Sequence, residues 1–412
     1  MASADPIDVA VVGGGPAGLA TATSLARDGA HRVVVLEREA RAGGIPRHAG
    51  HQGFGARDLK RLMSGPAYAE RLVERALAAG CELWAETQVT GWSDDGGLEL
   101  TSPLGRRTLH ARAIVLATGC RERPRAARLV PGSRDLRGVM TTGTLQQRVH
   151  LGAGLPGHRA IVVGADHVSA SAVATLAHGG ARAVAMVTER RTADVLAAYR
   201  AAILARHRVP LRARTEILMI HGRERVEGVT MRELDTGDLR HQACDMVVFT
   251  ADWVPDGELA ILGGAELDAG TRGPLLTTDF MTTRPGLFAV GNVVRGAEAA
   301  DVVALEGRAA ARSIRTYLSG RREWPSRLVR VTCAPPLAWV APNAVSAPAG
   351  SRRFAIVSHT PLLAPRIEVV QGGRLLWGRR VARVLPDRPA HIPGGWVRRV
   401  RAMDGPVVVS AG

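Results

Sequence analysis

Residues 7–39 hold the feature that most constrains the fold, IDVAVVGGGPAGLATATSLARDGAHRVVVLERE. The apolar run Ile7–Val12 predicts a buried β-strand, and the small residues beyond the turn predict a helix to about Asp28. A second apolar strand, Val33–Leu36, ends in Glu37. This order of strand, turn, helix, strand and terminal acid is typical of a unit that binds a dinucleotide.

The turn between the first strand and the helix, residues 13–18, reads GGGPAG. Gly13 permits the tight turn, Gly15 lets the backbone approach a pyrophosphate, and Gly18 lets the helix pack on the strand. The helix N-terminus supplies positive potential and free N–H groups. Glu37, about 20 residues further on, offers a carboxylate to both ribose hydroxyls.

Two later segments favour FAD as the dinucleotide. IVLATG, residues 114–119, predicts a strand and a Thr-Gly turn that pack against it. PGLFAVGNVV, residues 285–294, predicts a strand that ends in Gly291-Asn292, before a helix from about Ala299 to Leu318. The polar residue after that strand can bond the ribityl chain, and the helix N-terminus faces the flavin pyrimidine.

With these residues the chain resembles the pyridine nucleotide–disulfide oxidoreductase superfamily, flavoproteins with two dinucleotide domains, over roughly residues 7–320. Within it the chain is most similar to flavoprotein subunits of hydrogen cyanide synthase, opine oxidases and dye-linked proline or hydroxyproline dehydrogenases. The stretches that carry the likeness are GGIPRH (43–48), ATGCRERP (117–124), TTGTLQQ (141–147), VVGADHVS (162–169), ADWVPD (251–256), GLFAVGN (286–292) and GAEAADVVALEGR (296–308).

The resemblance implies which residues bind FAD. They are Gly13, Gly15, Gly18, Glu37, Gly44, Val89, Thr118, Gly119 and Asn292. Neighbours in the same motifs complete the expected cofactor site: Gly14, Pro16, Ala17, Arg38, Gly43, Arg47, Gly291, Asp301 and Val302. No residue is expected to bind a metal.

Three departures from the family pattern limit the activity. Disulfide-reducing members carry a cysteine pair, whereas the four cysteines here lie far apart with no C-x-x-C pair, which argues against disulfide reduction. Asn292 stands where an acid is usual, and it still offers a hydrogen bond. Related flavoprotein subunits also carry a cysteine-rich cluster segment that has no counterpart here, so any iron–sulfur centre would belong to another chain.

Residues 158–250 repeat the same plan with a change in the turn, which lies in IVVGADHVSASAV (161–173). A nicotinamide-binding turn needs glycine near position 166, and Asp166 adds both bulk and a like charge facing the diphosphate. Three interpretations stay open. In the first, the domain is structural and has lost its ligand. In the second, it binds NAD(P)H in a displaced pose. In the third, it binds another adenine nucleotide through Glu189-Arg190-Arg191.

GGIPRHAGHQGFG, residues 43–55, lacks helical periodicity and predicts a loop that passes toward the flavin. Its candidate catalytic residues are Arg47, His48 and His51. Arg47 could stabilise the reduced flavin or hold a substrate carboxylate bidentately. A neutral histidine could accept a proton as hydride leaves a C–H bond. The alternatives are simple contact with the flavin or the FAD phosphates, or a structural role.

Composition bounds the compartment and the partners. The formal net charge is +16, and residues 326–412 hold 13 Arg against 3 Asp or Glu, or 13 − 3 = +10. No aromatic platform or known motif accompanies these scattered arginines, so no nucleic-acid partner is expected. Three explanations of the basic C-terminal residues remain: they bind an acidic protein partner, they bind an anionic surface, or they form a solvated face. Neither a signal peptide nor a transmembrane run is indicated. With dispersed cysteines, the cytoplasm is the expected compartment.

The expected fold class is α/β, with a discontinuous FAD-binding Rossmann-like domain, an inserted second Rossmann-like domain and a small C-terminal β-rich module. The expected boundaries are 1–125 and 256–325 for the FAD-binding domain, 126–255 for the inserted NAD(P)-binding-like domain, and 326–412 for the docking module.

The C-terminal module shows strand patterns and turn signals. Residues 353–359 and 366–371 predict strands, and RLLWGRRVARVL (374–385) predicts another. Gln371-Gly372-Gly373 predicts the hairpin turn between the last two.

These features favour a FAD-dependent oxidoreductase. We expect a cytoplasmic subunit of a hetero-oligomer that oxidises a small amine or amino-acid-like substrate, or relays its electrons, with a non-nicotinamide acceptor. The expected partner is a second flavoprotein or an iron–sulfur subunit. Two alternatives remain: an NAD(P)H-dependent reductase of ferredoxin or a small carrier, and a catalytically silent scaffold that binds flavin or an adenine nucleotide.

Overall fold

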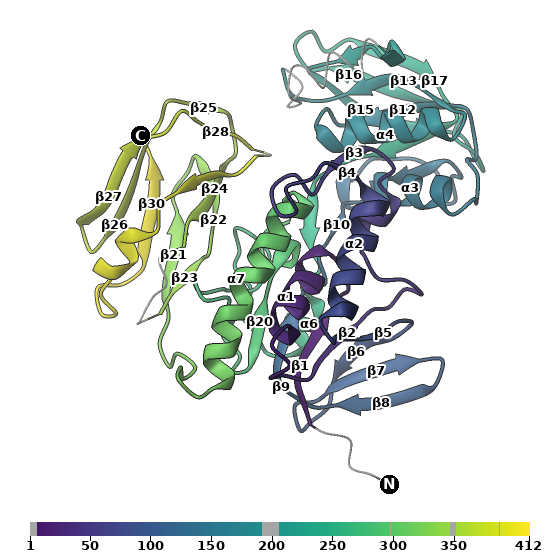
Figure 1. The fold of residues 1–412 in the computed structure, drawn as a ribbon. Coiled ribbons are helices and arrows are strands. Elements are labelled where there is room, and N and C mark those ends of the chain that lie inside the picture. The colour runs from purple at the N-terminus through teal and green to yellow at the C-terminus, as the bar shows by residue number, and fades with distance from the viewer. Residues whose placement is uncertain (1–5, 192–205, 297, 347–351, 387) are drawn as a thin grey trace.

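The computed structural model describes residues 6–191, 206–296, 298–346, 352–386 and 388–412. The chain forms three units (Figure 1): a first unit around strand β1, a second unit around strand β12, and a C-terminal unit of strands β21 to β30. The α/β fold class is confirmed. The expected boundaries at residues 125, 255 and 325 stay a prediction.

The first unit is built on a parallel sheet with the strand order β20-β9-β1-β2-β5. Strand β2 and residues 9–12 of strand β1 are continuous apolar runs because both faces of the sheet are covered there. β1 has β2 on one side and β9 on the other, so its carboxyl end is a topological switch point, where ligands bind in such sheets. The strands are β1 (Ile7–Val12), β2 (Val33–Leu36), β5 (Glu82–Trp84), β9 (Ala111–Leu116) and β20 (Leu287–Ala289).

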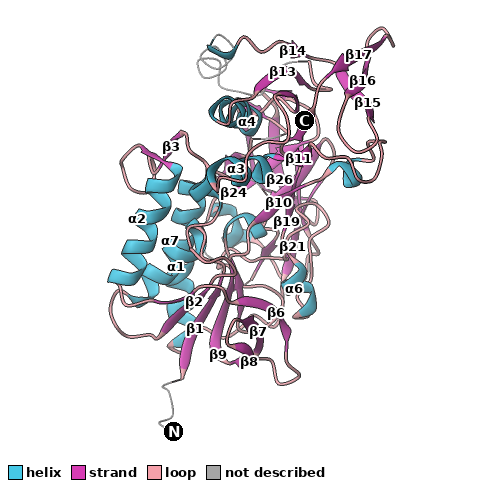
Figure 2. Ribbon diagram, turned by 90° about the vertical axis from the view of Figure 1, so that its right-hand side faces the viewer, coloured by secondary structure: helices cyan, strands magenta, loops and turns pink. Residues whose placement is uncertain are grey.

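Three helices lie together on one side of this sheet (Figure 2). The first begins with Pro16 at a position where the fixed φ of proline suits a helix, and it ends before the expected Asp28. Gly307 permits close packing on it, because a Cβ there would lie 2.3 Å from the Ala17 carbonyl oxygen. The helices are α1 (Pro16–Ala26), α2 (Gly65–Ala78) and α7 (Ala300–Leu318); smaller elements are β3 (Gln52–Phe54), β4 (Met63–Ser64), β6 (Gln88–Trp92), β7 (Leu98–Ser102), β8 (Gly105–Leu109) and α6 (Glu258–Leu262).

The second unit repeats the plan, as expected. Its parallel sheet has the order β11-β18-β12-β13-β14, beside an antiparallel sheet β15-β16-β17. Its elements are β11 (Val139–Thr141), α3 (Thr142–His150), β12 (Arg159–Val163), α4 (His167–His178), β13 (Arg182–Val187), β14 (Leu211–Arg212), β15 (Thr215–His221), β16 (Gly228–Glu233), β17 (Leu239–Ala243) and β18 (Met246–Phe249).

Two short antiparallel strands connect these units, β10 (Cys120–Glu122) and β19 (Trp253–Pro255). Ion pairs flank them: Arg121 Nη1 lies 3.0 Å from Asp256 Oδ1, and Arg123 Nη1 lies 2.8 Å from Asp252 Oδ2. Partly exposed pairs contribute about 0–1 kcal/mol each, so they orient the crossing more than they stabilise it.

In the C-terminal unit, the regular elements of the described residues are β-strands and one 3₁₀ helix. The expected hairpin is confirmed: Gln371 pairs with Arg374, and Gly372 and Gly373 have φ of +53° and +76°. The expected single strand at 374–385 is wrong, because the chain turns after Arg380 and buries Val384 in a separate pairing. The elements are β21 (Val329–Cys333), β22 (Leu337–Ala341), β23 (Ala344–Val345), β24 (Phe354–Ser358), β25 (Leu362–Leu363), β26 (Arg366–Gln371), β27 (Arg374–Arg380), β28 (Arg383–Val384), β29 (Ala390–Ile392), η4 (Gly395–Arg399) and β30 (Val407–Ala411).

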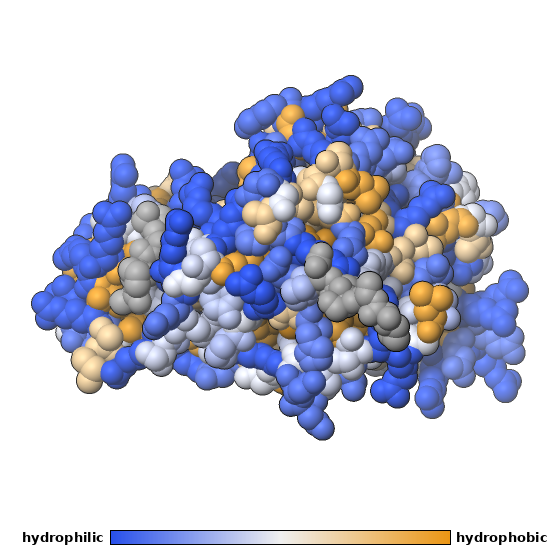
Figure 3. All heavy atoms as spheres, turned by 60° about the horizontal axis from the view of Figure 1, so that its bottom comes forward, coloured by the Kyte–Doolittle hydropathy of each residue, from blue (hydrophilic) through white to orange (hydrophobic). Residues whose placement is uncertain are grey.

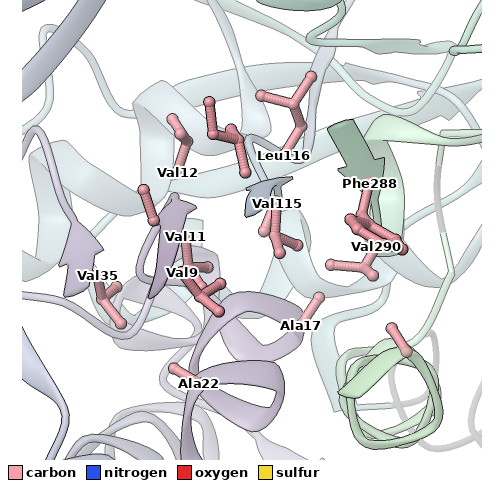
Figure 4. Packing of buried hydrophobic residues seen from close by; sticks show 14 of the residues in the cluster. Val9, Val11, Val12, Ala17, Ala22, Val35, Val115, Leu116, Phe288 and Val290 are labelled. Carbon is pink, nitrogen blue, oxygen red and sulfur yellow. The ribbon is translucent and has the colours of Figure 1, made fainter. Parts of the chain in front are cut away.

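The first unit has an apolar core in which β1 and β9 pack against α1 (Figure 4). Val9, Val11 and Val115 are fully buried there. The face in Figure 3 is mostly hydrophilic, with hydrophobic residues in scattered patches. No helix in the part of the chain that the structure describes is long and apolar enough to span a membrane.

Candidate functional site

The turn after β1 has the geometry that a pyrophosphate needs. Gly13 has a φ of +108°, and a Cβ on it would lie 2.5 Å from the Ala117 carbonyl oxygen. A Cβ on Gly18 would lie 2.0 Å from the Gly13 carbonyl oxygen. Gly15 differs, because the closest atom to a Cβ there is the Gly44 Cα at 3.9 Å. Its open side, at the N-terminus of α1, lets a phosphate chain approach the backbone.

Glu37, at the end of β2, is buried beside this turn. Its Oε2 accepts the N–H of Gly14 at 3.0 Å, and its Oε1 accepts the N–H of Glu39 at 2.9 Å. Burial raises the pKa of the Glu37 carboxyl, and the Gly14 hydrogen bond opposes that shift. Each oxygen keeps a second lone pair, so the carboxylate can also accept ribose hydroxyls. The neighbouring Arg38 is exposed.

The ends of β9 and β20 meet the same turn. Thr118 and Gly119 follow β9, and the Thr118 hydroxyl donates to the Asp256 carbonyl oxygen at 2.7 Å. Gly291, in η3 (Gly291–Val293) after β20, has a φ of +76°, and a Cβ on it would lie 2.7 Å from the Ala17 Cβ. Three strand ends therefore converge on α1.

The segment from Asn292 to α7 is held at both ends. Asn292 Oδ1 accepts the N–H of Glu298 at 2.9 Å, and its Nδ2 donates to the Glu298 carbonyl at 3.4 Å. Asp301 and Val302 lie in the first turn of α7. The Asp301 carboxylate accepts the Arg57 N–H at 3.0 Å and its guanidinium at 2.9 Å. It thus fastens the segment before α2 to the N-terminus of α7.

Residues 43–55 are more regular than the expected loop. They contain the 3₁₀ helix η1 (Ile45–His48) and the short strand β3. Gly43 and Gly44 begin the segment with φ of +124° and +62°. The Gly43 N–H donates to the Gly14 carbonyl at 2.7 Å, which brings the segment against the turn. Tertiary hydrogen bonds, absent from the local pattern, explain the added structure.

Arg47 and His48 are brought together in η1. The Arg47 guanidinium pairs with the Glu39 carboxylate and lies 3.1 Å from His48 Nε2. Its buried Nε has no hydrogen-bond partner among the residues that the structure describes. This donor can serve a phosphate or flavin oxygen, which fits a bound dinucleotide.

His48 is buried and held in its neutral form. Burial lowers the pKa of His48, and the charges of Arg47 and His150 lower it further. His150 comes from α3 of the second unit and packs on the first, because a Cβ on Gly50 would lie 2.6 Å from its Cε1. A neutral imidazole can accept a proton.

Acidification is expected to destabilise the protein partly through His48. A folded-state pKa below the unfolded value means that the folded protein binds fewer protons, so stability is lost as the pH falls below about 6.5. His48→Gln should lose less unfolding free energy than the wild type between about pH 7.5 and 5.5, measured by urea titration. The exposed His359 gives a matched control, and an equal change for His359→Gln would contradict the expectation.

His51 is placed differently from the other two candidates. Its Nδ1 lies 2.9 Å from the Gln52 carbonyl oxygen, and its ring lies 5.3 Å from the Phe54 ring. Phe54 in turn stacks on Tyr68 of α2 at 5.9 Å. His51 makes no hydrogen bond or ring contact with Arg47 or His48.

A buried polar group around Asp58 was not anticipated from the sequence. The Tyr68 hydroxyl donates to Asp58 Oδ2 at 2.9 Å, and Arg308 Nη2 of α7 lies 3.6 Å from the same oxygen. Burial raises the pKa of Asp58, and the Tyr68 hydrogen bond opposes it. Asp58 and Arg308 are 250 residues apart, so no local pattern links them.

The expected cofactor residues converge at the carboxyl edge of the first sheet, apart from Val89, which is buried on β6 of the antiparallel sheet. The open Gly15, the acceptor Glu37 and the unpaired Arg47 Nε all fit FAD. With a second unit of the same plan, this edge defines a flavoprotein with two dinucleotide-type domains.

The chain belongs to the pyridine nucleotide-disulphide oxidoreductase family, whose model matches residues 7–307. The resemblance seen in the sequence is thus confirmed. The protein is an FAD-dependent oxidoreductase.

Individual proteins of known sequence or structure are similar to this chain. Thioredoxin reductase from Treponema pallidum (strain Nichols) is 28% identical over 292 residues, 69% of this chain and 88% of that protein. One of the subunits of opine oxidase from Rhizobium meliloti (strain 1021) is 29% identical over 198 residues, 47% of this chain and 41% of that protein. The structure of thioredoxin reductase from Lactococcus lactis has a TM-score of 0.64 at 19% identity and covers 76% of this chain and 99% of its own.

The turn of the second unit is closed by its own side chains. Asp166 is the N-cap of α4, and its Oδ1 accepts the Ser169 N–H at 2.8 Å and the Ser169 hydroxyl at 2.9 Å. The Ser169 Oγ also lies 2.6 Å from Thr250 Oγ1. A carboxylate therefore occupies the helix terminus where a dinucleotide phosphate would bind, so these residues do not fit a nicotinamide dinucleotide in the ordinary pose. Glu189, Arg190 and Arg191 follow β13 and are exposed.

Proposed function

We propose that this chain is the FAD-carrying subunit of a hetero-oligomeric dehydrogenase for a small amine or amino-acid-like substrate, with electrons passed to a partner subunit or a non-nicotinamide acceptor. The carboxylate of Asp166 at the N-terminus of α4 carries this proposal. The likeness to one of the subunits of opine oxidase supports it. A second flavoprotein or an iron–sulfur protein is the partner that we propose.

The cysteines support a route without disulfide chemistry. The structure describes all four as free, and burial raises the pKa of the Cys81 thiol to about 11 and those of Cys120 and Cys244 to about 12. Thiol exchange needs the thiolate, which such groups do not form near neutral pH. Free, dispersed thiols also suit the reducing cytoplasm that we propose as the compartment.

Bound FAD would supply a two-electron acceptor for a hydride from a substrate C–H bond. Glu37 would bind the ribose, and the N–H groups at the start of α1 would bind the pyrophosphate. Asn292 would hold the segment that leads to α7. His48 would accept the proton from the substrate nitrogen at Nε2, once the Arg47 guanidinium leaves that atom to hold a substrate carboxylate or flavin oxygen.

A second candidate is an NAD(P)H-dependent reductase of a ferredoxin or small carrier. It is favoured by the extent of the match to thioredoxin reductase and by exposed Arg190 and Arg191 after β13, which could receive a nucleotide phosphate. It requires a pose that avoids Asp166.

Anaerobic mixing with NADH or NADPH separates the two functions. We expect the flavin absorbance of the purified, FAD-loaded protein to persist with either nucleotide, because Asp166 blocks the phosphate position. Asp166→Gly removes the carboxylate but leaves the Thr250 and Ser169 hydroxyls in the turn, so we expect it to bind NADH no more tightly. Rapid bleaching of the wild type would establish the reductase instead, and tight binding by the variant would show a domain one residue from function.

A further inference from the structure

A pocket of about 140 Å³ lies between the three helices of the first unit. It has two sides on α1 and α2 and a third at Arg308 of α7. By the same measure one water molecule needs roughly 10–15 Å³, so the pocket has room for a small anion. It is lined by Ala20, Thr23, Ser24, Arg27, Leu72, Arg75 and Arg308.

The positive charge in this pocket is only partly balanced by the protein. Arg308 is paired with Asp58, whose Oδ2 lies 3.6 Å away. Arg27, which is exposed, and half-buried Arg75 have no ion-pair or hydrogen-bond partner among the residues that the structure describes. An anion bound in the pocket can pair with both of these guanidinium groups. Two uncompensated positive charges suit a dianion better than a single carboxylate, and a phosphomonoester carries about −1.5 to −2 at pH 7.

The hydroxyl groups that line the pocket further restrict which ligands can bind there. The Thr23 hydroxyl donates to the Leu19 carbonyl at 2.7 Å, and the Ser24 hydroxyl donates to the Ala20 carbonyl at 2.8 Å. Because their donors are used, each oxygen can meet a ligand only as an acceptor. They suit a group with its own O–H, which a polyol phosphate or monohydrogen phosphate provides.

We propose that the pocket between α1, α2 and α7 binds a phosphate group, as inorganic phosphate or a small phosphomonoester. Thr23 is seven residues beyond Pro16, which places the pocket roughly 10 Å along α1 from the dinucleotide turn. The guanidinium forks of Arg27 and Arg75 bind the phosphate oxygens bidentately. The site is therefore additional to the one for FAD.

Calorimetric titration of the FAD-loaded full chain at constant ionic strength tests this. Inorganic phosphate and glycerol 3-phosphate should bind with about one site, and glycerol should not bind. Arg75→Gln and Arg27→Gln should each weaken the affinity at least about tenfold, because hydrogen bonds between charged groups are lost. Arg71→Gln is the matched control, since Arg71 lies one turn earlier on α2, is exposed and pairs with Glu74 at 2.9 Å. The affinity of the Arg71→Gln variant for phosphate should stay within about twofold of the wild-type value.

Three different results would contradict the proposed phosphate site. Equal weakening by Arg71→Gln and Arg75→Gln would mean diffuse attraction by the surface, and no binding of either phosphate at millimolar concentration would remove the site. Binding to phosphatidic acid vesicles without binding to free glycerol 3-phosphate would point to a membrane surface and also overturn the proposal. Retained flavin absorbance in each variant shows that it has folded.

Discussion

Gly15→Ala is expected to yield a folded protein that is purified largely without FAD. Gly15 has an ordinary negative φ of −82°, and a Cβ there would meet only the Gly44 Cα, at 3.9 Å. The protein itself therefore tolerates the methyl group. A pyrophosphate passing this backbone does not, because the methyl group occupies the open side of the turn. We expect FAD affinity to fall by about a hundredfold or more, equivalent to at least about 2.7 kcal/mol.

Gly18→Ala provides the contrast, because its Cβ would lie 2.0 Å from a backbone oxygen that cannot move away. This variant should lose stability as well as FAD. The ratio of FAD to protein after purification, equilibrium dialysis with added FAD and thermal unfolding of the apoproteins distinguish the two. A Gly15→Ala protein that retains full FAD would show that the pyrophosphate does not pass Gly15.

The dinucleotide turn could be predicted because its determinants are close together in the sequence. The glycines at 13, 15 and 18 act within one turn, and Glu37 is reached by a helix of ordinary length. For Asp166, the sequence predicted only that its side chain would obstruct the binding of a dinucleotide phosphate. Its partner Ser169, three residues on, is the sequence signal of a helix cap, which explains why an aspartate is favourable there.

The contacts that hold the carboxyl edge of the first sheet together could not be predicted in this way. Arg57 and Asp301 are 244 residues apart, and their pairing depends on how the second unit is inserted between them. His150 reaches η1 from the second unit for the same reason. Such contacts follow from the relative placement of units, which no local period encodes.

Glu306→Gln is expected to destabilise the protein strongly. Arg295, whose side chain is 6% exposed, binds Glu306 through two nitrogens at 2.6 and 3.3 Å. Glu298 lies further away, at 3.7 Å, and the Arg295 Nε has no hydrogen-bond partner among the described residues. Removing one partner leaves a buried charge poorly compensated, which costs about 3–5 kcal/mol. Arg295 lies in the segment that begins at Asn292, a residue expected to bind FAD, so the affinity for FAD should fall as well.

Urea unfolding of the FAD-free proteins measures the stability change without a contribution from ligand binding. Glu266→Gln is the matched control, since its pair with Arg330 is about half exposed and should contribute about 0–1 kcal/mol. The double variant Arg295→Leu, Glu306→Leu should be more stable than Glu306→Gln, because the charge of Arg295 is removed together with its partner. If Glu306→Gln and Glu266→Gln cost the same, Arg295 is solvated in solution, and the segment between Asn292 and α7 must be held by Glu298 and Asp301 alone.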